Sequence, residues 1–323
     1  MTTSYQTIWF PKQNICKLKT LDFKPKYNPD TILIKSKYSL ISQGSEKLFF
    51  QGNVPASTQQ SMIVPYQLNN GQFPCNYGYS LVGQVVEGPS HLLNQHVHVL
   101  HPHTSMAQVS SDDCTIIPPS IDLRLAPLIS QIQTAITAIW DSKVTFGEHI
   151  LIAGFGLIGA CIAGLLSQRK DMSIYIIEPN EYRANLAASL GFNLLDTTDK
   201  NCDIDVAFYC TNNPGSLSYV MQQLCHEGKL VHCAWHGNHS INVNLGDFFH
   251  TKRLQWISSQ VSHIPSYKSK AWTTQRRNQL ALKSINLPIF SQIPQSLLPF
   301  LNLQNLYEKH LIDDHLIQLI TYE

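Results

Sequence analysis

Three glycines in the middle of the chain have the spacing that brings a backbone close to a phosphate group. They are Gly154, Gly156 and Gly159, in a segment that follows an apolar run and precedes a run of small, helix-forming residues. In such a G-x-G-x-x-G motif the first glycine permits a sharp turn, the second lets a pyrophosphate approach, and the third lets helix and strand pack closely. The N–H groups of the helix N-terminus then favour the negative charge of the phosphates.

An acidic residue stands where a dinucleotide site needs one. The apolar run 173–177 ends at Glu178, 19 residues after Gly159. A carboxylate at this distance can accept hydrogen bonds from an adenosine ribose, and it repels a 2′-phosphate. The sequence therefore predicts NAD(H) in preference to NADP(H), although Arg183 could soften that preference. Phe155, Leu157 and Ile158 complete the phosphate-binding loop.

The composition is that of a globular protein with two domains. The chain has 323 residues, of which 43% are hydrophobic and 14% charged, and its formal net charge is +1. This balance gives no basic surface for nucleic acid. No apolar stretch is long enough for a membrane span and no signal-peptide pattern begins the chain, so we expect a cytoplasmic protein without membrane attachment. The eight cysteines form no C-x-x-C motif, which favours reduced thiols.

The elements that would position these residues fall into two patterns. Residues 1 to about 118 are typical of short strands with frequent turns, as in a barrel-like β domain. From about 122 to 260, strands alternate with helices, which predicts an α/β fold with a doubly wound parallel sheet. The expected strands are 149–153, 173–177, 206–209 and 229–233, with helices at 125–140 and 181–190. A strand-like run at 316–320 is expected to return to the first domain.

Three segments of the chain resemble the medium-chain dehydrogenase/reductase superfamily. They are 41–49, ISQGSEKLF, then 77–83, YGYSLVG, and 258–261, SSQV; Trp272 with Arg276 and Arg277 adds to the resemblance. The chain looks most like a zinc-independent branch that includes the bacteriochlorophyllide 2-hydroxyethyl dehydrogenases. The resemblance implies a GroES-like catalytic domain at 1–121, a Rossmann NAD-binding domain at 122–262 and a C-terminal segment, 263–323, that returns to the catalytic domain.

The chain departs from the zinc enzymes of that superfamily at the metal site. Gln43, Tyr79 and about Ser130 stand at the three ligand positions, and Ser80 replaces the acid of the G-H-E segment. Zinc favours thiolate, imidazole and carboxylate ligands, so no metal is expected. The histidines at 96, 98, 101 and 103 also suggest a metal site, but Pro102 breaks their geometry.

Without zinc, hydrogen-bond donors must stabilise charge on a carbonyl oxygen and a side chain must exchange the proton. The resemblance implies that Ser45 relays a proton. The alternative is that Ser45 is only a turn residue, whose hydroxyl bonds its own backbone. The resemblance also places Tyr79 at the nicotinamide pocket. There its hydroxyl could act as an acid, or its ring could simply line the pocket. His103 is a candidate for facing the substrate, and Glu46 for orienting His103 or Lys47. The alternative for Lys47 is a solvated charge on the protein surface, without a catalytic role.

Further cofactor contacts are expected on the nucleotide domain. The resemblance places Thr134 near the nicotinamide, and doubly wound sheets bind ligands at the carboxyl ends of their strands. The residues expected there are Cys210, Thr211, Ala234, Trp235 and Ser258.

These residues predict a zinc-independent, NAD(H)-dependent oxidoreductase that interconverts an alcohol and a carbonyl of a small-molecule substrate by hydride transfer. The alternatives are an NADPH-dependent enoyl or quinone reductase of the same superfamily, or a dinucleotide-binding protein without catalysis. The resemblance is compatible with a homodimer, and the sequence does not fix the oligomeric state.

Overall fold

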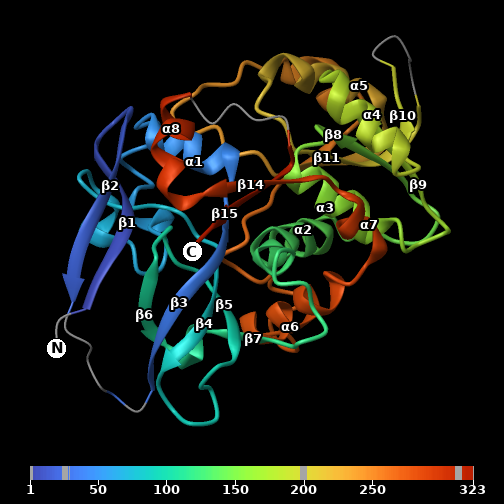
Figure 1. Cartoon of the computed structure of the whole chain (residues 1–323). Coiled ribbons are helices and arrows are strands. Elements are labelled where there is room, and N and C mark those ends of the chain that lie inside the picture. Colours follow the sequence, from blue (N-terminus) through green and yellow to red (C-terminus); the bar gives the residue numbers. More distant parts are fainter. Residues whose placement is uncertain (1–2, 24–27, 29, 197–201, 310–314, 323) are drawn as a thin grey trace. The chain divides into compact units, whose positions relative to one another are not determined.

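The computed structural model describes residues 3–23, 28, 30–196, 202–309 and 315–322 (Figure 1). These residues form two compact units. The first unit contains the chain up to Ser130 together with the segment from Pro294 on, and the second unit runs from Gln131 to Ile293. No helix among the described residues is long and apolar enough to cross a membrane.

The first unit is built mainly of antiparallel strands. A seven-stranded sheet has the order β14-β15-β3-β4-β5-β7, with β6 also paired to β3, and β1 and β2 form a separate hairpin (Figure 1). The strands are β1 (Thr3–Lys12), β2 (Ile15–Phe23), β3 (Thr31–Leu40), β4 (Leu81–Glu87), β5 (His96–Val99), β6 (Met106–Ser110), β7 (Thr115–Ile117), β14 (Gln295–Pro299) and β15 (Ile317–Thr321).

Two short helices pack against this β structure. They are α1 (Gln43–Phe50) and α8 (Leu303–Glu308), accompanied by 3-10 turns at Gln60–Met62, Leu68–Gly71, Ser111–Asp113, Ala126–Leu128 and Phe300–Asn302. The last residues of α1 are buried, and Phe50 meets Phe10 of β1 and Tyr307 of α8 at ring separations of 5.9 and 5.2 Å. This aromatic cluster fixes α1, the helix that carries three of the catalytic candidates.

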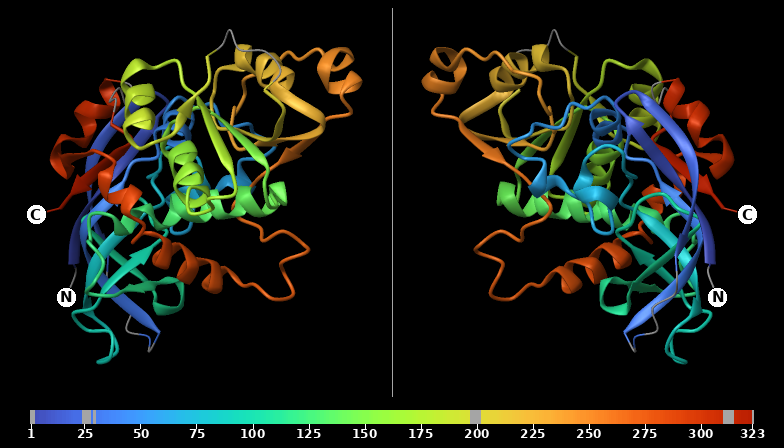
Figure 2. Two further views of the ribbon diagram at one scale, coloured as in Figure 1. Left: turned by 90° about the vertical axis from the view of Figure 1, so that its right-hand side faces the viewer. Right: turned by 90° about the vertical axis from the view of Figure 1, so that its left-hand side faces the viewer.

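The second unit is a parallel sheet of the order β10-β9-β8-β11-β12-β13. Its strands are β8 (His149–Ala153), β9 (Ser173–Ile177), β10 (Asn193–Leu194), β11 (Ile204–Tyr209), β12 (Leu224–His232) and β13 (Gln255–Ser258). The central strand β8 is buried and almost wholly apolar, because helices cover a parallel sheet on both faces. Figure 2 shows these green and yellow strands from two sides, with helices packed against them.

The helices of this unit are α2 (Ile129–Ser142), α3 (Leu157–Leu166), α4 (Glu181–Ser189), α5 (Leu217–Gln223), α6 (Thr274–Ser284) and α7 (Pro288–Gln292), with shorter turns at Pro214–Ser216 and Leu245–Phe249. Helix α4 begins at Asn180, whose side chain accepts a hydrogen bond from the Arg183 N–H at 3.0 Å, and it ends before Gly191, which has φ +87°.

Most of the expected elements are present. Strands β8 and β9 have the expected bounds, and β15 pairs with β3 in the first unit, as expected for the end of the chain. The helix expected from Leu125 begins as a 3-10 turn at Ala126–Leu128, and regular α-helix starts only at Ile129. Pro127 explains the delay, since it lacks the N–H that a helix interior needs.

The C-terminal return starts later than the expected boundary at residue 263. The segment up to Ile293 belongs to the second unit, because Ile289 and Phe290 of α7 are buried there. They lie against Gly164 of α3, where a Cβ would meet their side chains at 3.0 and 3.2 Å. Only the chain from Pro294 on belongs to the first unit.

Candidate active site

Two of the three motif glycines are required by the packing of the loop itself. Gly154 follows β8 with φ +98°, a conformation that L side chains rarely adopt, and its Cβ would lie 3.0 Å from the carbonyl oxygen of Cys210. At Gly159 a Cβ would lie 2.0 Å from the carbonyl oxygen of Gly154. Strand, turn and helix α3 therefore pack as closely as the motif predicts.

The middle glycine differs from its neighbours. Gly156 is the N-cap of α3, with φ −75° and ψ −174°, which any residue can adopt. The nearest described atom to a Cβ at this position is Nη1 of Arg183, at 3.9 Å. Nothing in the described fold requires glycine here, whereas a phosphate approaching the helix N-terminus does.

Glu178 lies at the same loop. Its Oε2 accepts a hydrogen bond from the N–H of Phe155 at 2.7 Å, and its Oε1 accepts one from the N–H of Asn180 at 2.9 Å. The half-buried carboxylate is thus held beside the glycine turn at the end of β9. Arg183 of α4 brings a cation close to Gly156, with Nη1 at 3.9 Å from where a Cβ would be.

The other cofactor candidates follow the same edge of the sheet. Cys210 and Thr211 follow β11, Ala234 and Trp235 follow β12, and Ser258 ends β13. The side chains of these residues are half-buried, except Ser258, which is exposed; Thr134 is half-buried on α2. The structure thus brings most of the predicted cofactor residues to the carboxyl ends of adjacent parallel strands, where ligands bind in this architecture.

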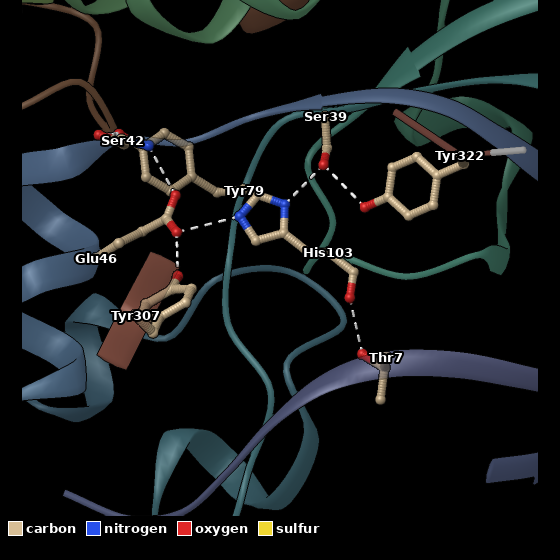
Figure 3. Close-up of polar contacts among 8 residues, drawn as sticks. All are labelled: Thr7, Ser39, Ser42, Glu46, Tyr79, His103, Tyr307 and Tyr322. Carbon is tan, nitrogen blue, oxygen red and sulfur yellow. Dashed lines mark hydrogen bonds and ion pairs between the residues drawn. The ribbon is translucent and has the colours of Figure 1, made fainter. Parts of the chain in front are cut away.

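In the first unit, Glu46 is the centre of a buried polar network (Figure 3). Its Oε1 accepts a hydrogen bond from the N–H of Ser42 at 2.7 Å, and its Oε2 contacts His103 Nε2 at 3.1 Å and the Tyr307 hydroxyl. Burial raises the pKa of this carboxyl, but the ion pair and hydrogen bonds outweigh it and lower the pKa overall. The same burial, with the Glu46 charge, raises the pKa of Tyr307, which therefore remains a donor.

His103 extends this network to the end of the chain. Its Nδ1 lies 2.8 Å from the Ser39 hydroxyl, which in turn lies 2.8 Å from the hydroxyl of Tyr322 (Figure 3). Its ring also lies against Gly78, where a Cβ would meet His103 Cδ2 at 2.7 Å and where φ is +117°. His103 thus fixes the backbone immediately before Tyr79.

Burial changes the roles expected for two of the catalytic candidates. Glu46 and His103 are each 0% exposed, and both nitrogens of His103 are occupied by partners within the first unit. His103 is therefore enclosed in this structure, where the expectation had it facing the substrate. Glu46 contacts His103, as its expected orienting role would require, and that role stays a prediction. Both groups hold the segments around Ser42 and Tyr79.

The remaining candidates are accessible. Lys47 is exposed on α1, in agreement with the solvated-charge alternative, and Ser45 is half-buried one turn from Ser42. The half-buried Tyr79 donates a hydrogen bond from its hydroxyl to Ser42 Oγ. Ser42, which the sequence pattern did not single out, is thus the hydroxyl that partners Tyr79, because the helix cap brings residue 42 to the phenol.

A second buried polar cluster contains Ser80 and Ser130, two of the positions at which the chain departs from the zinc enzymes that it resembles. His98 Nε2 lies 3.1 Å from both Ser80 Oγ and Ser130 Oγ. The Ser80 hydroxyl donates to the carbonyl of Pro127 at 2.6 Å, and the Ser130 hydroxyl donates to the carbonyl of Tyr79 at 3.4 Å. With both serine hydroxyls donating to carbonyls, an Nε2 that carries the ring proton can donate to the two serine oxygens. Burial lowers the pKa of His98 to about 3, which keeps the ring neutral.

These positions do not fit a catalytic zinc ion. An amide, a phenol and a hydroxyl stand at residues 43, 79 and 130, and each makes a hydrogen bond within the first unit. Such groups are poor zinc ligands. Among the described residues, no three histidine, cysteine or acidic side chains come together as a metal site would require.

Comparison with known proteins gives weak sequence similarity and strong structural similarity. No protein-family model matches the chain. The L-threonine 3-dehydrogenase of Xanthomonas campestris pv. campestris (strain B100) is 27% identical over 126 residues, which are 36% of this chain. The chain spans only 37% of the length of this curated relative.

Two solved structures match over nearly the whole chain. The 2R,3R-butanediol dehydrogenase of Bacillus subtilis superposes with a TM-score of 0.78 and 17% identity, covering 99% of this chain and 100% of that one. The L-idonate 5-dehydrogenase of Escherichia coli gives 0.77 and 14%, covering 100% of this chain and 99% of that one. The chain therefore has the fold of these dehydrogenases, with a GroES-like first unit and a Rossmann second unit.

Proposed function

We propose that this protein is an NAD(H)-dependent oxidoreductase that interconverts an alcohol and a carbonyl, as a member of the medium-chain dehydrogenase/reductase superfamily. The observation that carries the proposal is Gly156, a glycine that no described part of the fold requires and that a bound pyrophosphate would require. The similarity to an L-threonine 3-dehydrogenase and a butanediol dehydrogenase supports an alcohol as the substrate class.

The loop residues favour NAD(H) over NADP(H). Glu178 lies at the end of β9 with its carboxylate beside the glycine turn, where it can accept hydrogen bonds from a ribose diol. A 2′-phosphate at that position would meet a negative charge. The backbone N–H groups at the start of α3 would hold the pyrophosphate, and Arg183 would add a cation beside it.

The bound nicotinamide would accept or deliver the hydride, and the chain's own residues would handle the proton. We assign that role to Tyr79 and Ser42. The Tyr79 phenol can donate to a carbonyl oxygen, and its bond to Ser42 Oγ holds the ring in one orientation. The buried Glu46 holds Ser42 through the backbone, and His103 holds Tyr79 through Gly78. This arrangement performs alcohol–carbonyl exchange independently of zinc.

The proximity of Arg183 to Gly156 favours a second candidate function. An arginine there could pair with a 2′-phosphate, as in an NADPH-dependent enoyl or quinone reductase. The third candidate, a dinucleotide-binding protein without catalysis, would bind cofactor but transfer no hydride.

The test is reduction of carbonyls by protein from which metals have been removed with a chelator. We expect oxidation of NADH with a panel of small aldehydes and ketones, at a rate that added zinc does not raise. A requirement for zinc would contradict the assignment of Tyr79. Turnover only with NADPH and activated alkenes or quinones would favour the second candidate. NADH binding without turnover of either panel would favour the third.

A further inference from the structure

Two of the eight cysteines are neighbours at the carboxyl end of the Rossmann sheet. Cys210 is the first residue after β11 and Cys233 the first after β12, and these strands are paired in parallel up to Tyr209 and His232. The pairing continues beyond the last pair, since the N–H of Cys233 donates to the carbonyl of Tyr209 at 3.0 Å. The two cysteines are therefore in register.

Register places both side chains on the same face of the sheet. Residues in register on neighbouring strands are about 5 Å apart, which lies within the Cα separation that a disulfide spans. The rings of the preceding pair, Tyr209 and His232, meet at 5.3 Å on the opposite face, as this register requires. The two thiols are close enough to hydrogen-bond with each other, and both residues are half-buried.

The electrostatics of the pair suit an oxidisable dithiol. The hydrogen bond with Cys210 and burial raise the pKa of Cys233 well above its usual value. Cys233 thus keeps its proton and can donate it to a thiolate at Cys210. A thiolate supported by a neighbouring thiol is the form that reacts with peroxides.

Cys210 also touches the phosphate-binding loop. Its carbonyl oxygen and carbon lie 3.0 and 3.1 Å from where a Cβ on Gly154 would be, and its N–H donates to the carbonyl of Ala153 at 2.8 Å. Any movement of Cys210 toward Cys233 therefore acts on the backbone of the first motif glycine.

We propose that hydrogen peroxide oxidises Cys210 and Cys233 to a reversible disulfide, and that this bond weakens binding of the dinucleotide. The second half of the proposal rests on the proposed function. In this structure none of the eight cysteines forms a disulfide, and all eight lie among the described residues, so the proposed disulfide is a modification of the resting state.

The chemistry balances with peroxide as the oxidant. The Cys210 thiolate attacks one peroxide oxygen, the O–O bond breaks, and the leaving hydroxide takes a proton to become water. The sulfur of Cys233 then attacks the sulfur of the resulting sulfenic acid, the S–S bond forms, and hydroxide leaves with the Cys233 proton as a second water. The two thiols lose two electrons together, and the peroxide gains them.

The test uses the full chain after mild peroxide treatment and blocking of the remaining thiols. Trypsin releases Cys233 in the peptide 230–252 and Cys210 in the peptide 201–229, which also carries Cys202 and Cys225. A protein with Cys202→Ser and Cys225→Ser is therefore the background. We expect the two peptides to be linked, the link to disappear on reduction, and no link after the further change Cys210→Ser.

The functional readout is NADH affinity before and after oxidation. We expect the Kd to rise at least about tenfold in the oxidised protein and to recover on reduction, within the usual range of coupling between sites. No linked peptide, or a link that leaves NADH affinity unchanged, overturns the proposal. The peptide readout does not depend on NADH, so failure of the reduced protein to bind NADH contradicts the proposed function separately.

Discussion

At the scale of single residues, the proposed function depends on the contacts that explain each motif glycine and each polar side chain of the site. Gly154 and Gly159 are explained by contacts within the loop, while Gly156 has no such contact among the described residues, and we assign it to a ligand at the N-terminus of α3. Tyr79 is half-buried and held by Ser42, whereas Glu46 and His103 are enclosed and hold other segments. We therefore assign the exposed and half-exposed groups to contact with the cofactor or substrate. We assign the enclosed groups to holding other segments of the first unit in place.

The first prediction concerns Gly156→Ala. Because the backbone conformation suits alanine and the nearest described atom is 3.9 Å away, the free energy of unfolding should change by less than about 1 kcal/mol. The Kd for NADH, measured by quenching of tryptophan fluorescence, should rise at least about tenfold, which is about 1.4 kcal/mol. Gly44→Ala, an open helix position of the first unit, is the control and should leave NADH affinity unchanged. Equal affinity in both variants would make the Gly156 argument wrong.

The second prediction concerns Tyr79→Phe. Loss of the hydroxyl removes the proton donor but keeps the ring, so kcat for carbonyl reduction should fall roughly 10²-fold or more with little change in NADH affinity. Tyr267→Phe, which removes a half-exposed hydroxyl of the second unit, is the control and should keep its kcat. Unchanged turnover in Tyr79→Phe would mean that the ring of Tyr79 only lines the pocket and that its hydroxyl takes no part in proton transfer.

Sequence reasoning predicted the arrangement of the glycine loop better than it predicted the partners of the buried polar residues. The motif glycines and Glu178 lie within one strand–turn–helix–strand unit, from β8 to the end of β9, so their spacing alone predicts their arrangement. The partners of Glu46 and His103 could not be found in this way. From the far end of the chain, Tyr307 reaches Glu46, and Tyr322 reaches the Ser39 hydroxyl beside His103. Spacing within a segment carries no information about such contacts.

At the scale of elements, β5 and the loop after it carry buried histidines that cannot be protonated in the folded state. Burial lowers the pKa of His98 to about 3 and that of His101 to about 4. The ordinary value in an unfolded chain is about 6.5. Stability from these two groups is therefore complete above pH 6.5 and is lost as the pH falls toward 4.

The third prediction follows from this difference in proton binding. Near pH 5 His98 and His101 together bind about two more protons in the unfolded state than in the folded state, so these two groups should lower the free energy of unfolding by about 2.7 kcal/mol for each unit that the pH falls. Urea unfolding between pH 7 and pH 5 measures the slope. His98→Gln should lower the slope near pH 5 by about 1.4 kcal/mol per pH unit, the share of one histidine, while His91→Gln, at an exposed position, should not. A slope that His98→Gln leaves intact would show that other groups cause the acid sensitivity.

The fourth prediction concerns the element that carries the Glu46 network, α1. Glu46→Gln keeps the shape but removes the charge that pairs with His103 and accepts from Tyr307, so the free energy of unfolding should fall by about 1–3 kcal/mol. The neighbouring Lys47→Gln changes an exposed charge and should stay within about 0.5 kcal/mol. Chemical denaturation compares the two, and equal stabilities would mean that the network does not support α1.

Element types were more predictable than element boundaries. The parallel sheet follows from apolar runs that alternate with helices, and β8 and β9 match their expected bounds. The start of α2 and the end of the second unit were misplaced for different reasons. Pro127 delays regular helix, and Ile289 and Phe290 bind α7 to α3 through burial, which only the tertiary structure reveals.

At the scale of the whole molecule, each unit supplies one part of the proposed reaction. We assign the dinucleotide site to the carboxyl edge of the sheet in the second unit, and the proton donor to Tyr79 of the first unit. The polar clusters at Glu46 and His98 are both buried in the first unit, where their members hydrogen-bond to one another. The expected homodimer stays a prediction, which sedimentation of the purified chain would test.

The most direct test of the central claim is a parallel titration of metal-free protein with NADH and NADPH, followed by tryptophan fluorescence. The account predicts saturable NADH binding with NADPH at least about tenfold weaker, because Glu178 opposes a 2′-phosphate. Preference for NADPH would contradict the Glu178 assignment and favour the enoyl or quinone reductase. Binding of neither would mean that the glycine loop is only a structural turn and would contradict the dehydrogenase itself.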